Sequence, residues 1–183
     1  MKTWFTADTH FGHANIIKYC NRPFKDIDRM NEILIKNWNS RVKKNDIVLF
    51  LGDFCFKSKS KRGEGLEYKP EYYLSQLNGH ITFIKGNHDN NNSLDARISS
   101  LIVNISDKNI FCNHFPENFD SRFKINLTAH VHEKWKIRKI YNSFLINVGI
   151  DVWKYSPVNI NEILSVLNKY KKGLVDENGN RKE

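Results

Sequence analysis

The chain repeats one order of elements: a short apolar run, typical of a buried strand, is followed directly by polar residues. In the first half, apolar runs at 4–7, 47–51 and 81–84 alternate with helices predicted over 26–39 and 70–77. Alternation of strand and helix favours a parallel sheet, in which functional loops lie at the carboxyl ends of the strands. The polar residues after the strands are therefore the first place to look for chemistry.

The second half of the chain has a different pattern. Strand-like runs follow one another with little helix between them, at 101–105, 110–112, 125–129, 135–140 and 144–148. They predict a second, mainly antiparallel sheet. A final helix is predicted over 160–170, and the charged residues 173–183 are expected to form a disordered tail. With 183 residues, 40% of them hydrophobic, the chain fits one domain over residues 1–172.

The polar blocks after the strands are rich in histidine, carboxylate and amide side chains. Five of the seven histidines lie in them. The blocks are Asp8-Thr9-His10, Gly52-Asp53, Gly86-Asn87-His88-Asp89, His114 and Ala129-His130-Val131-His132. Imidazole and carboxylate suit borderline divalent cations such as Mn, Fe and Zn, and the amide adds a neutral oxygen ligand. Together the blocks predict a hydrolytic site with two metal ions.

Two of the blocks contain candidate ligands two residues apart. Asp8 and His10 form one such pair, and His130 and His132 form the other. In an extended segment alternate side chains project to the same face, so we expect each pair to hold one metal from one side. Taken singly, each block also has an ordinary structural explanation, because a lone histidine or a Gly-Asp turn is common in proteins. The combination and the position after strands favour the metal site.

These blocks, in this order, resemble those of the calcineurin-like metallophosphoesterase superfamily. The matching motifs extend from Asp8 to His132. The residues at 8–13 and the Asn-Arg-Pro-Phe at 21–24 resemble in particular the small single-domain phosphoesterases of bacteria and phages. The resemblance implies an α/β (α+β) fold, a four-layer αββα sandwich of two mixed β-sheets flanked by helices.

The resemblance also implies a role for each block. One metal is expected to bind Asp8, His10 and His132, and the other Asn87, His114 and His130, with Asp53 bridging the two. The bridging carboxylate holds the cations about 3.5–4 Å apart, so that a shared hydroxide attacks phosphorus. We expect manganese first, with Fe, Zn, Ni or Co also suitable.

Two further residues are given catalytic roles by the resemblance. His88 is expected to protonate the leaving oxygen, and Asp89 to orient and charge His88. Two departures from the family are visible. Ala129 stands where the family usually has glycine, and Phe54-Cys55-Phe56 after the bridging aspartate lacks the arginine of Ser/Thr protein phosphatases. A protein phosphatase is therefore not expected.

Three residues near the first block are candidates for substrate binding: His13, Asn15 and Arg22. Arg22 can hold a phosphate oxygen bidentately, or it can simply pair with a carboxylate. The basic segment 57–62 is either a rim over the site or a solvated loop. Asn147 and Asp151 either support the site from behind or form a turn.

The net charge and the cysteine content indicate which kind of partner and which cellular compartment to expect. A net charge of +9 favours an anionic partner such as a nucleotide, a nucleic acid or another phosphate ester. The three cysteines show no close pairing, and no apolar signal region or membrane-length stretch is visible, so we expect a cytoplasmic protein. No oligomeric state is predicted.

The leading hypothesis is a dinuclear metal-dependent phosphohydrolase, a phosphomonoesterase or phosphodiesterase of nucleotides or other small phosphate esters. A nuclease acting on nucleic-acid phosphodiesters is the second hypothesis, based on the basic charge and the aromatic content. A non-catalytic, metal-stabilised scaffold is the third. It is disfavoured because His88, the expected proton donor, is retained.

Overall fold

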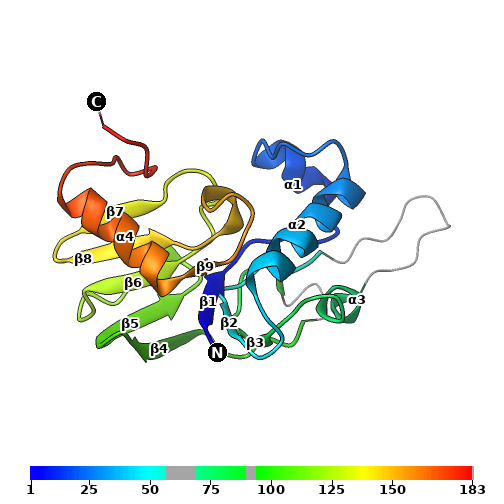
Figure 1. The fold of residues 1–183 in the computed structure, drawn as a ribbon, viewed down its shortest axis with the longest axis horizontal. Coiled ribbons are helices and arrows are strands. Elements are labelled where there is room, and N and C mark those ends of the chain that lie inside the picture. Colours follow the sequence, from blue (N-terminus) through cyan, green and yellow to red (C-terminus); the bar gives the residue numbers. More distant parts are fainter. Residues whose placement is uncertain (57–68, 90–93, 183) are drawn as a thin grey trace.

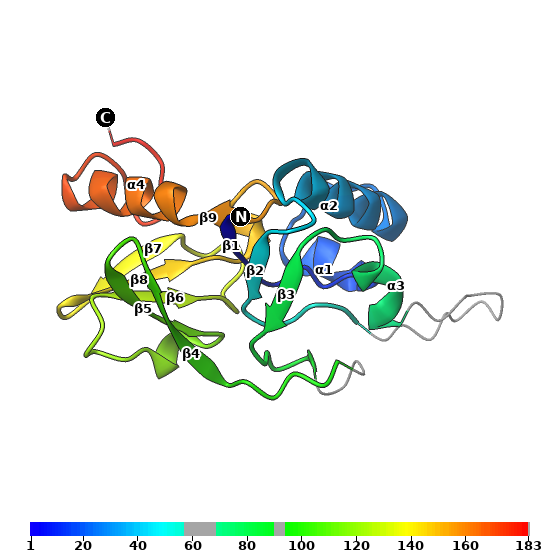
Figure 2. The same ribbon diagram turned by 60° about the horizontal axis from the view of Figure 1, so that its bottom comes forward.

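A computed structural model describes residues 1–56, 69–89 and 94–182. The basic segment 57–62 lies outside these described residues. The elements follow the chain in the order β1 (Thr3–Thr6), α1 (Ala14–Tyr19), α2 (Ile27–Arg41), β2 (Ile47–Phe50), α3 (Pro70–Leu74), β3 (His80–Phe83), β4 (Ser100–Ile105), β5 (Lys108–Asn113), η2 (Pro116–Asn118), β6 (Ile125–Thr128), β7 (Ile137–Ile140), β8 (Ser143–Asn147), η3 (Ile150–Val152), β9 (Val158–Asn159) and α4 (Ile160–Lys171). Figures 1 and 2 show their arrangement.

Two mixed sheets form the centre of the molecule. The first has the strand order β3-β2-β1-β9, in which β1, β2 and β3 are parallel and β9 is antiparallel. The second has the order β4-β5-β6-β8-β7. Its central strands β5, β6 and β8 are parallel, and only the outer strands β4 and β7 pair antiparallel. The predicted α/β class with two mixed sheets is confirmed, but the expectation that the second sheet is mainly antiparallel is wrong.

Alternate residues of the first sheet face two different cores. Phe5 on β1 and Leu49 on β2 pack with apolar residues of the second sheet and with α4. Trp4 on β1 and Val48 on β2 pack instead with α1, α2 and α3. The helices α1, α2 and α3 therefore cover one face of the first sheet, and α4 packs in the core that both sheets share (Figure 2). Burial on both faces explains why the β2 run is continuously apolar.

Helix starts follow local capping chemistry. The Asp26 side chain accepts a hydrogen bond from the backbone N–H of Arg29 and caps α2. Asn159 and Glu162 form a reciprocal capping box at the start of α4. Helix α1 has six residues and is not among the helices that the sequence predicts.

The carboxyl-terminal segment after α4 makes local contacts. Val175 forms an isolated bridge with Arg181 and is largely buried. The Asp176 carboxylate accepts backbone hydrogen bonds from Asn178 and Asn180, which close the turn between them. Among the described helices none is both long and apolar enough to cross a membrane.

Candidate metal centre

The candidate ligands lie just past the carboxyl ends of five strands. Strands β1, β2 and β3 of the first sheet and β5 and β6 of the second sheet end beside one another, joined by backbone hydrogen bonds such as Asp8 N to Gly52 O and Ala129 N to His114 O. Because these strand ends are adjacent, they bring seven side chains together, which are Asp8, His10, Asp53, Asn87, His114, His130 and His132.

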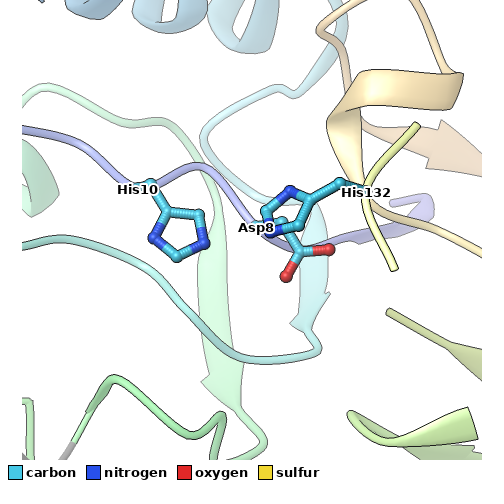
Figure 3. Close-up of side chains that lie close together, drawn as sticks. All are labelled: Asp8, His10 and His132. Atoms are coloured by element: carbon cyan, nitrogen blue, oxygen red, sulfur yellow. The ribbon is translucent and has the colours of Figure 1, made fainter. Parts of the chain in front are cut away.

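Two groups of three side chains are placed so that each could hold a cation. The first cluster is Asp8, His10 and His132, shown in Figure 3, and the second cluster is Asp53, His114 and His130. Within each cluster the potential ligand atoms lie within 4.8 Å of one another. The structure therefore brings together the residues that the sequence assigns to each metal.

Asp53 belongs to the second cluster and also faces the first. Its Oδ2 atom is 3.6 Å from Nε2 of His10 and 3.5 Å from Nε2 of His114. The Asn87 Oδ1 atom lies 3.1 Å from the same His114 nitrogen, so the amide reaches the second cluster. One carboxylate thus faces ligands of both clusters.

The backbone that presents the ligands is not extended. Five candidate ligands have positive φ angles between 48° and 70°, namely Asp8, His10, Asp53, His130 and His132. Residues other than glycine adopt this left-handed conformation rarely, and it concentrates at functional sites. The expected alternation of side chains along an extended segment is therefore the wrong explanation for these pairs, although the residues of each pair do converge on the centre.

Three glycines leave room for the ligand side chains. A Cβ atom on Gly86 would overlap the Asp53 carboxylate, and one on Gly52 would lie 2.6 Å from Nδ1 of His114. A Cβ on Gly149 would come within 2.5 Å of Asp8 Oδ2. These positions accept no side chain without displacing a candidate ligand.

Buried polar atoms without hydrogen-bond partners point to a bound cation. Asp8 and His10 are almost completely buried, yet within the described part of the chain Asp8 Oδ1 and both ring nitrogens of His10 lack a partner. Such groups are costly to bury unless something binds them. In the second cluster, His114 Nδ1–H donates to the Leu51 carbonyl 2.6 Å away, which leaves Nε2 as a lone-pair donor. The residues present therefore fit divalent cations.

Burial also shifts the acidity of the first cluster. It raises the pKa of Asp8 to about 6, and it lowers the pKa of His10 well below the usual range, with the nearby His132 acting in the same direction. A neutral imidazole is the form that binds metal. His10 is thus already in the ligand form at neutral pH.

Comparison with known proteins agrees with this geometry. The family model for calcineurin-like phosphoesterases matches residues 1–173. The chain belongs to this family. An uncharacterized protein of Methanocaldococcus jannaschii is 37% identical to it over 181 residues, which cover 93% of each chain. The gene 66 protein of Mycobacterium phage D29 is 28% identical, over 93% of this chain and 98% of the phage protein.

The fold is shared with a solved structure. A protein of unknown function from Aquifex aeolicus superimposes with a TM-score of 0.67 at 22% identity, covering 90% of this chain and 98% of that one. Family membership makes this chain a metal-dependent hydrolase of phosphoester bonds.

Of the two roles that the sequence allows for Arg22 in this phosphoesterase, phosphate ligand or partner of a carboxylate, the structure shows the second. Its side chain has no exposed surface, and its Nε and Nη2 atoms hold the two carboxylate oxygens of Asp151 at 2.8 and 3.0 Å. The remaining donors reach the carbonyls of Asp8 and Thr9 and the sulfur of Met30. All five N–H donors are used inside the protein, so none is left for a substrate.

Asp151 connects this arginine to the first cluster. Its Oδ2 atom lies 3.0 Å from Nδ1 of His132. Burial favours neutral His132, but the hydrogen bonds to Asp151 and Cys20 outweigh it and raise the pKa of His132 to about 11. The contact orients Nε2 of His132 away from Asp151. Asp151 thus supports the site from behind, which is one of the two roles that the sequence allows for it. Asn147, the other such candidate, accepts a hydrogen bond from Gly149 N and donates to the carbonyls of His132 and Trp135.

Cys20, for which the sequence indicates no role, lies beside this network. Its sulfur, His132 and Asp151 form a third group whose ligand atoms lie within 4.8 Å of one another. Both oxygens of Asp151 are already bound by the Arg22 guanidinium, and that positive charge opposes a cation there. This group is better explained as a support for His132 than as a metal site.

Asp89 does not contact the His88 ring in the way that the sequence predicts. It is fully buried, and its carboxylate accepts three backbone hydrogen bonds, from Asp53 at 3.0 Å, Phe54 at 3.0 Å and Gly86 at 2.7 Å. Among the described residues no hydrogen bond joins Asp89 to the His88 ring. Asp89 therefore holds the loop that presents Asp53, and the expectation that it orients His88 is wrong.

His88 itself lies at the edge of the centre. Its ring is half-buried and meets the His10 ring edge to face, with centroids 5.5 Å apart. Its backbone N–H donates to Asp53 Oδ1 at 2.9 Å. This position beside both clusters suits a group that acts on the substrate rather than on a metal.

The two other substrate-binding candidates occupy different positions. His13 packs against His10 and stacks on Phe56, with ring centroids 4.3 Å apart. Burial lowers its pKa, and its Nδ1 atom is buried without a partner in the described structure. Asn15 lies exposed on α1. The structure thus places His13 beside the first cluster and leaves Asn15 at the surface.

Proposed function

We propose that this phosphoesterase hydrolyses small phosphate esters, nucleotides among them, at a centre of two divalent cations. The observation that carries the proposal is the position of Asp53, whose Oδ2 atom lies about equally far from His10 and His114. A carboxylate that faces ligands of two clusters is suited to bridge two cations. The unpartnered atoms of Asp8 and His10 support the first position.

The ligand assignment follows the two clusters. Asp8, His10 and His132 hold one cation, and Asn87, His114 and His130 hold the other, with Asp53 shared. When bound, two such cations lower the pKa of water and neutralise charge on the phosphate. Manganese is the first choice for this set of nitrogen and oxygen donors, and Fe, Zn, Ni and Co also suit it.

His88 supplies the proton for the leaving oxygen. An alkoxide leaving group needs protonation, and imidazole is the side chain best matched to that task near neutral pH. The His88 backbone N–H donates to Asp53, and its imidazole lies against the His10 ring of the first cluster. Asp89 keeps that loop in place through its three backbone contacts.

His132 is positioned by a chain of buried charges. Arg22 fixes the Asp151 carboxylate through two contacts, and Asp151 in turn fixes Nδ1 of His132. Arg22 also binds the Asp8 carbonyl, so the same guanidinium touches the backbone of a second ligand of the first cluster. We assign Arg22 and Asp151 as positioning residues.

The test is a screen of the purified protein against phosphate esters and metals together. The substrates are nucleoside monophosphates, cyclic nucleotides, aryl phosphates and short single-stranded oligonucleotides, each with Mn, Fe, Zn, Ni or Co. We expect metal-dependent hydrolysis of at least one small ester and none after chelation. Cleavage of oligonucleotides alone would favour a nuclease, and inactivity toward all of them would refute the proposal.

A further inference from the structure

A cavity of about 440 Å³ opens directly beside the second cluster. It lies where the segment after β3 meets the start of β4 and the end of β5, and Asn87, a candidate ligand, forms part of its wall. The other lining residues are Lys85, Gly86, Ser99, Asn113, Phe115 and Asn118. A volume in the range of about 300–1,000 Å³ is usual for small-molecule sites.

The wall combines one aromatic ring with neutral polar groups and one cation. Phe115 contacts the rings of two candidate ligands, His114 at 4.8 Å and His130 at 5.1 Å between centroids, and also faces the cavity. None of the lining residues that the structure describes carries a carboxylate. Within the described residues, Lys85 makes no ion pair, so its ammonium group is available to an anion.

The aromatic wall is held in place before any ligand arrives. The buried Asn113 side chain donates to the Ser99 carbonyl at 3.0 Å and accepts from the Phe115 backbone N–H at 2.8 Å. The Asn113 amide therefore links the Ser99 part of the wall to the Phe115 part. The Lys85 part of the wall is fixed by its backbone N–H, which donates to the Ile98 carbonyl at 2.8 Å. A cavity fixed in this way loses little freedom when a ligand binds.

We infer that this cavity is a nucleoside subsite, which binds the base and sugar attached to the phosphate hydrolysed at the metal centre. The inference rests on the proposed function for the phosphate, and it adds the chemical class of the attached group. Phe115 stacks on the base, the Asn118 amide and the Ser99 hydroxyl pair with base and sugar edges, and Lys85 attracts the phosphate.

Other groups match the wall less well. A second phosphate would meet only one cation, and a purely apolar group would meet only one apolar side chain. A nucleoside presents an aromatic face together with hydrogen-bonding edges, which is the combination that this wall offers.

The test compares adenosine, adenosine 5′-monophosphate and methyl phosphate on the full chain. Adenosine carries no phosphate, so its binding, followed by saturation-transfer NMR, reports the subsite independently of hydrolysis. We expect Phe115→Ala to weaken adenosine binding about tenfold, the scale of base stacking on an aromatic ring. The ratio of KM for adenosine 5′-monophosphate to KM for methyl phosphate rises by a similar factor. Tyr141→Ala, which removes an exposed ring in the turn between β7 and β8, is the matched control and changes neither quantity.

Lys85→Gln provides a second variant should Phe115→Ala fail to fold. It weakens binding of adenosine 5′-monophosphate several-fold and leaves adenosine binding as it is, because only the phosphate carries charge. Absence of adenosine binding, or equal losses on both esters in Phe115→Ala, would overturn the subsite. Adenosine binding that depends on Phe115 in a protein that hydrolyses no ester would support the subsite and refute the proposed function instead.

Discussion

The two clusters of the metal centre are supported in different ways. Behind the first cluster lies a buried ion pair, in which Arg22 and Asp151, 129 residues apart in the chain, fix His132. Behind the second lie close backbone contacts: the Leu51 carbonyl fixes His114, and Gly52 and Gly86 leave the space that the ligands occupy. A ligand can thus be oriented by a charged side chain from a distant segment or by the backbone beside it, and the two supports should fail differently when mutated.

Asp53 faces ligands of both clusters, so its removal should weaken metal binding at both positions, whatever supports each cluster. Asp53→Ala is expected to weaken metal binding at both positions by more than about 100-fold, because a shared anionic ligand is lost. Metal content after dialysis, measured by inductively coupled plasma mass spectrometry, gives the answer. Full occupancy of both positions in this variant would contradict the bridging role.

Gly86→Ala should weaken metal binding at both positions, because it acts on Asp53, which faces ligands of both clusters. The new Cβ atom overlaps the Asp53 carboxylate, and overpacking of this kind costs about 1–3 kcal/mol of folding stability. We expect weaker metal binding together with a lower Tm. Gly173→Ala is the matched control: its Cβ meets nothing within 4 Å, although its φ of +69° is unfavourable for alanine. The control should lower Tm and leave metal binding unchanged.

His88→Asn should leave both clusters occupied, since His88 is assigned to the leaving group. General acid catalysis contributes about 10²–10⁴-fold, so hydrolysis of esters with an alkoxide leaving group should fall by that factor. Nitrophenyl esters need little protonation and should lose much less. The ratio of kcat/KM for the two kinds of ester measures the effect. Equal losses on both, with metal content unchanged, would show that His88 positions the phosphate instead.

Asp151→Asn should weaken the first position alone. Loss of a partner that orients a metal-binding histidine costs about 10–100-fold in metal affinity, and the second position has its own backbone support. Titration calorimetry with Mn should resolve one weakened and one unchanged binding event. Arg22→Lys should behave in the same direction, because an ammonium group cannot make the five contacts of the guanidinium.

The control for the ion pair is another arginine–carboxylate pair away from the centre. Arg41→Gln breaks the partly exposed contact of 2.6 Å with Glu162 between α2 and α4. Such pairs contribute about 0–1 kcal/mol, so Tm should move little and both metal positions should stay as they are. Equal loss at both positions in Asp151→Asn would mean that the ion pair supports the whole fold rather than the first cluster.

The sequence predicts much of this architecture because each ligand follows an apolar run. Strands such as β2, with Asp53 shortly after it, are visible as continuous apolar residues, and parallel strands bring their carboxyl ends together. The residues of both clusters were predicted in this way. The sequence did not predict which strands of the second sheet are parallel and which are antiparallel. Strand direction depends on long-range connections that short apolar runs do not encode.

The supporting residues could not be predicted for a different physical reason. The sequence leaves Arg22 open between a phosphate ligand and a partner of a carboxylate, and it suggests Asp89 as a partner of His88 because the two residues are adjacent. Their actual partners, Asp151 for Arg22 and the Asp53 backbone for Asp89, lie far away in the chain. The positive φ angles at the ligands likewise depend on the packing of two sheets, and the only local signal is glycine beside some of them.

The most direct test of the account is a crystal structure of the protein grown with Mn, with the metal positions located by anomalous scattering. We expect two ions per chain, about 3.5–4 Å apart, with one Asp53 carboxylate contacting both. Asp8, His10 and His132 should complete one coordination sphere, and Asn87, His114 and His130 the other. A single ion at full occupancy, or two ions of which only one contacts Asp53, would contradict the central claim.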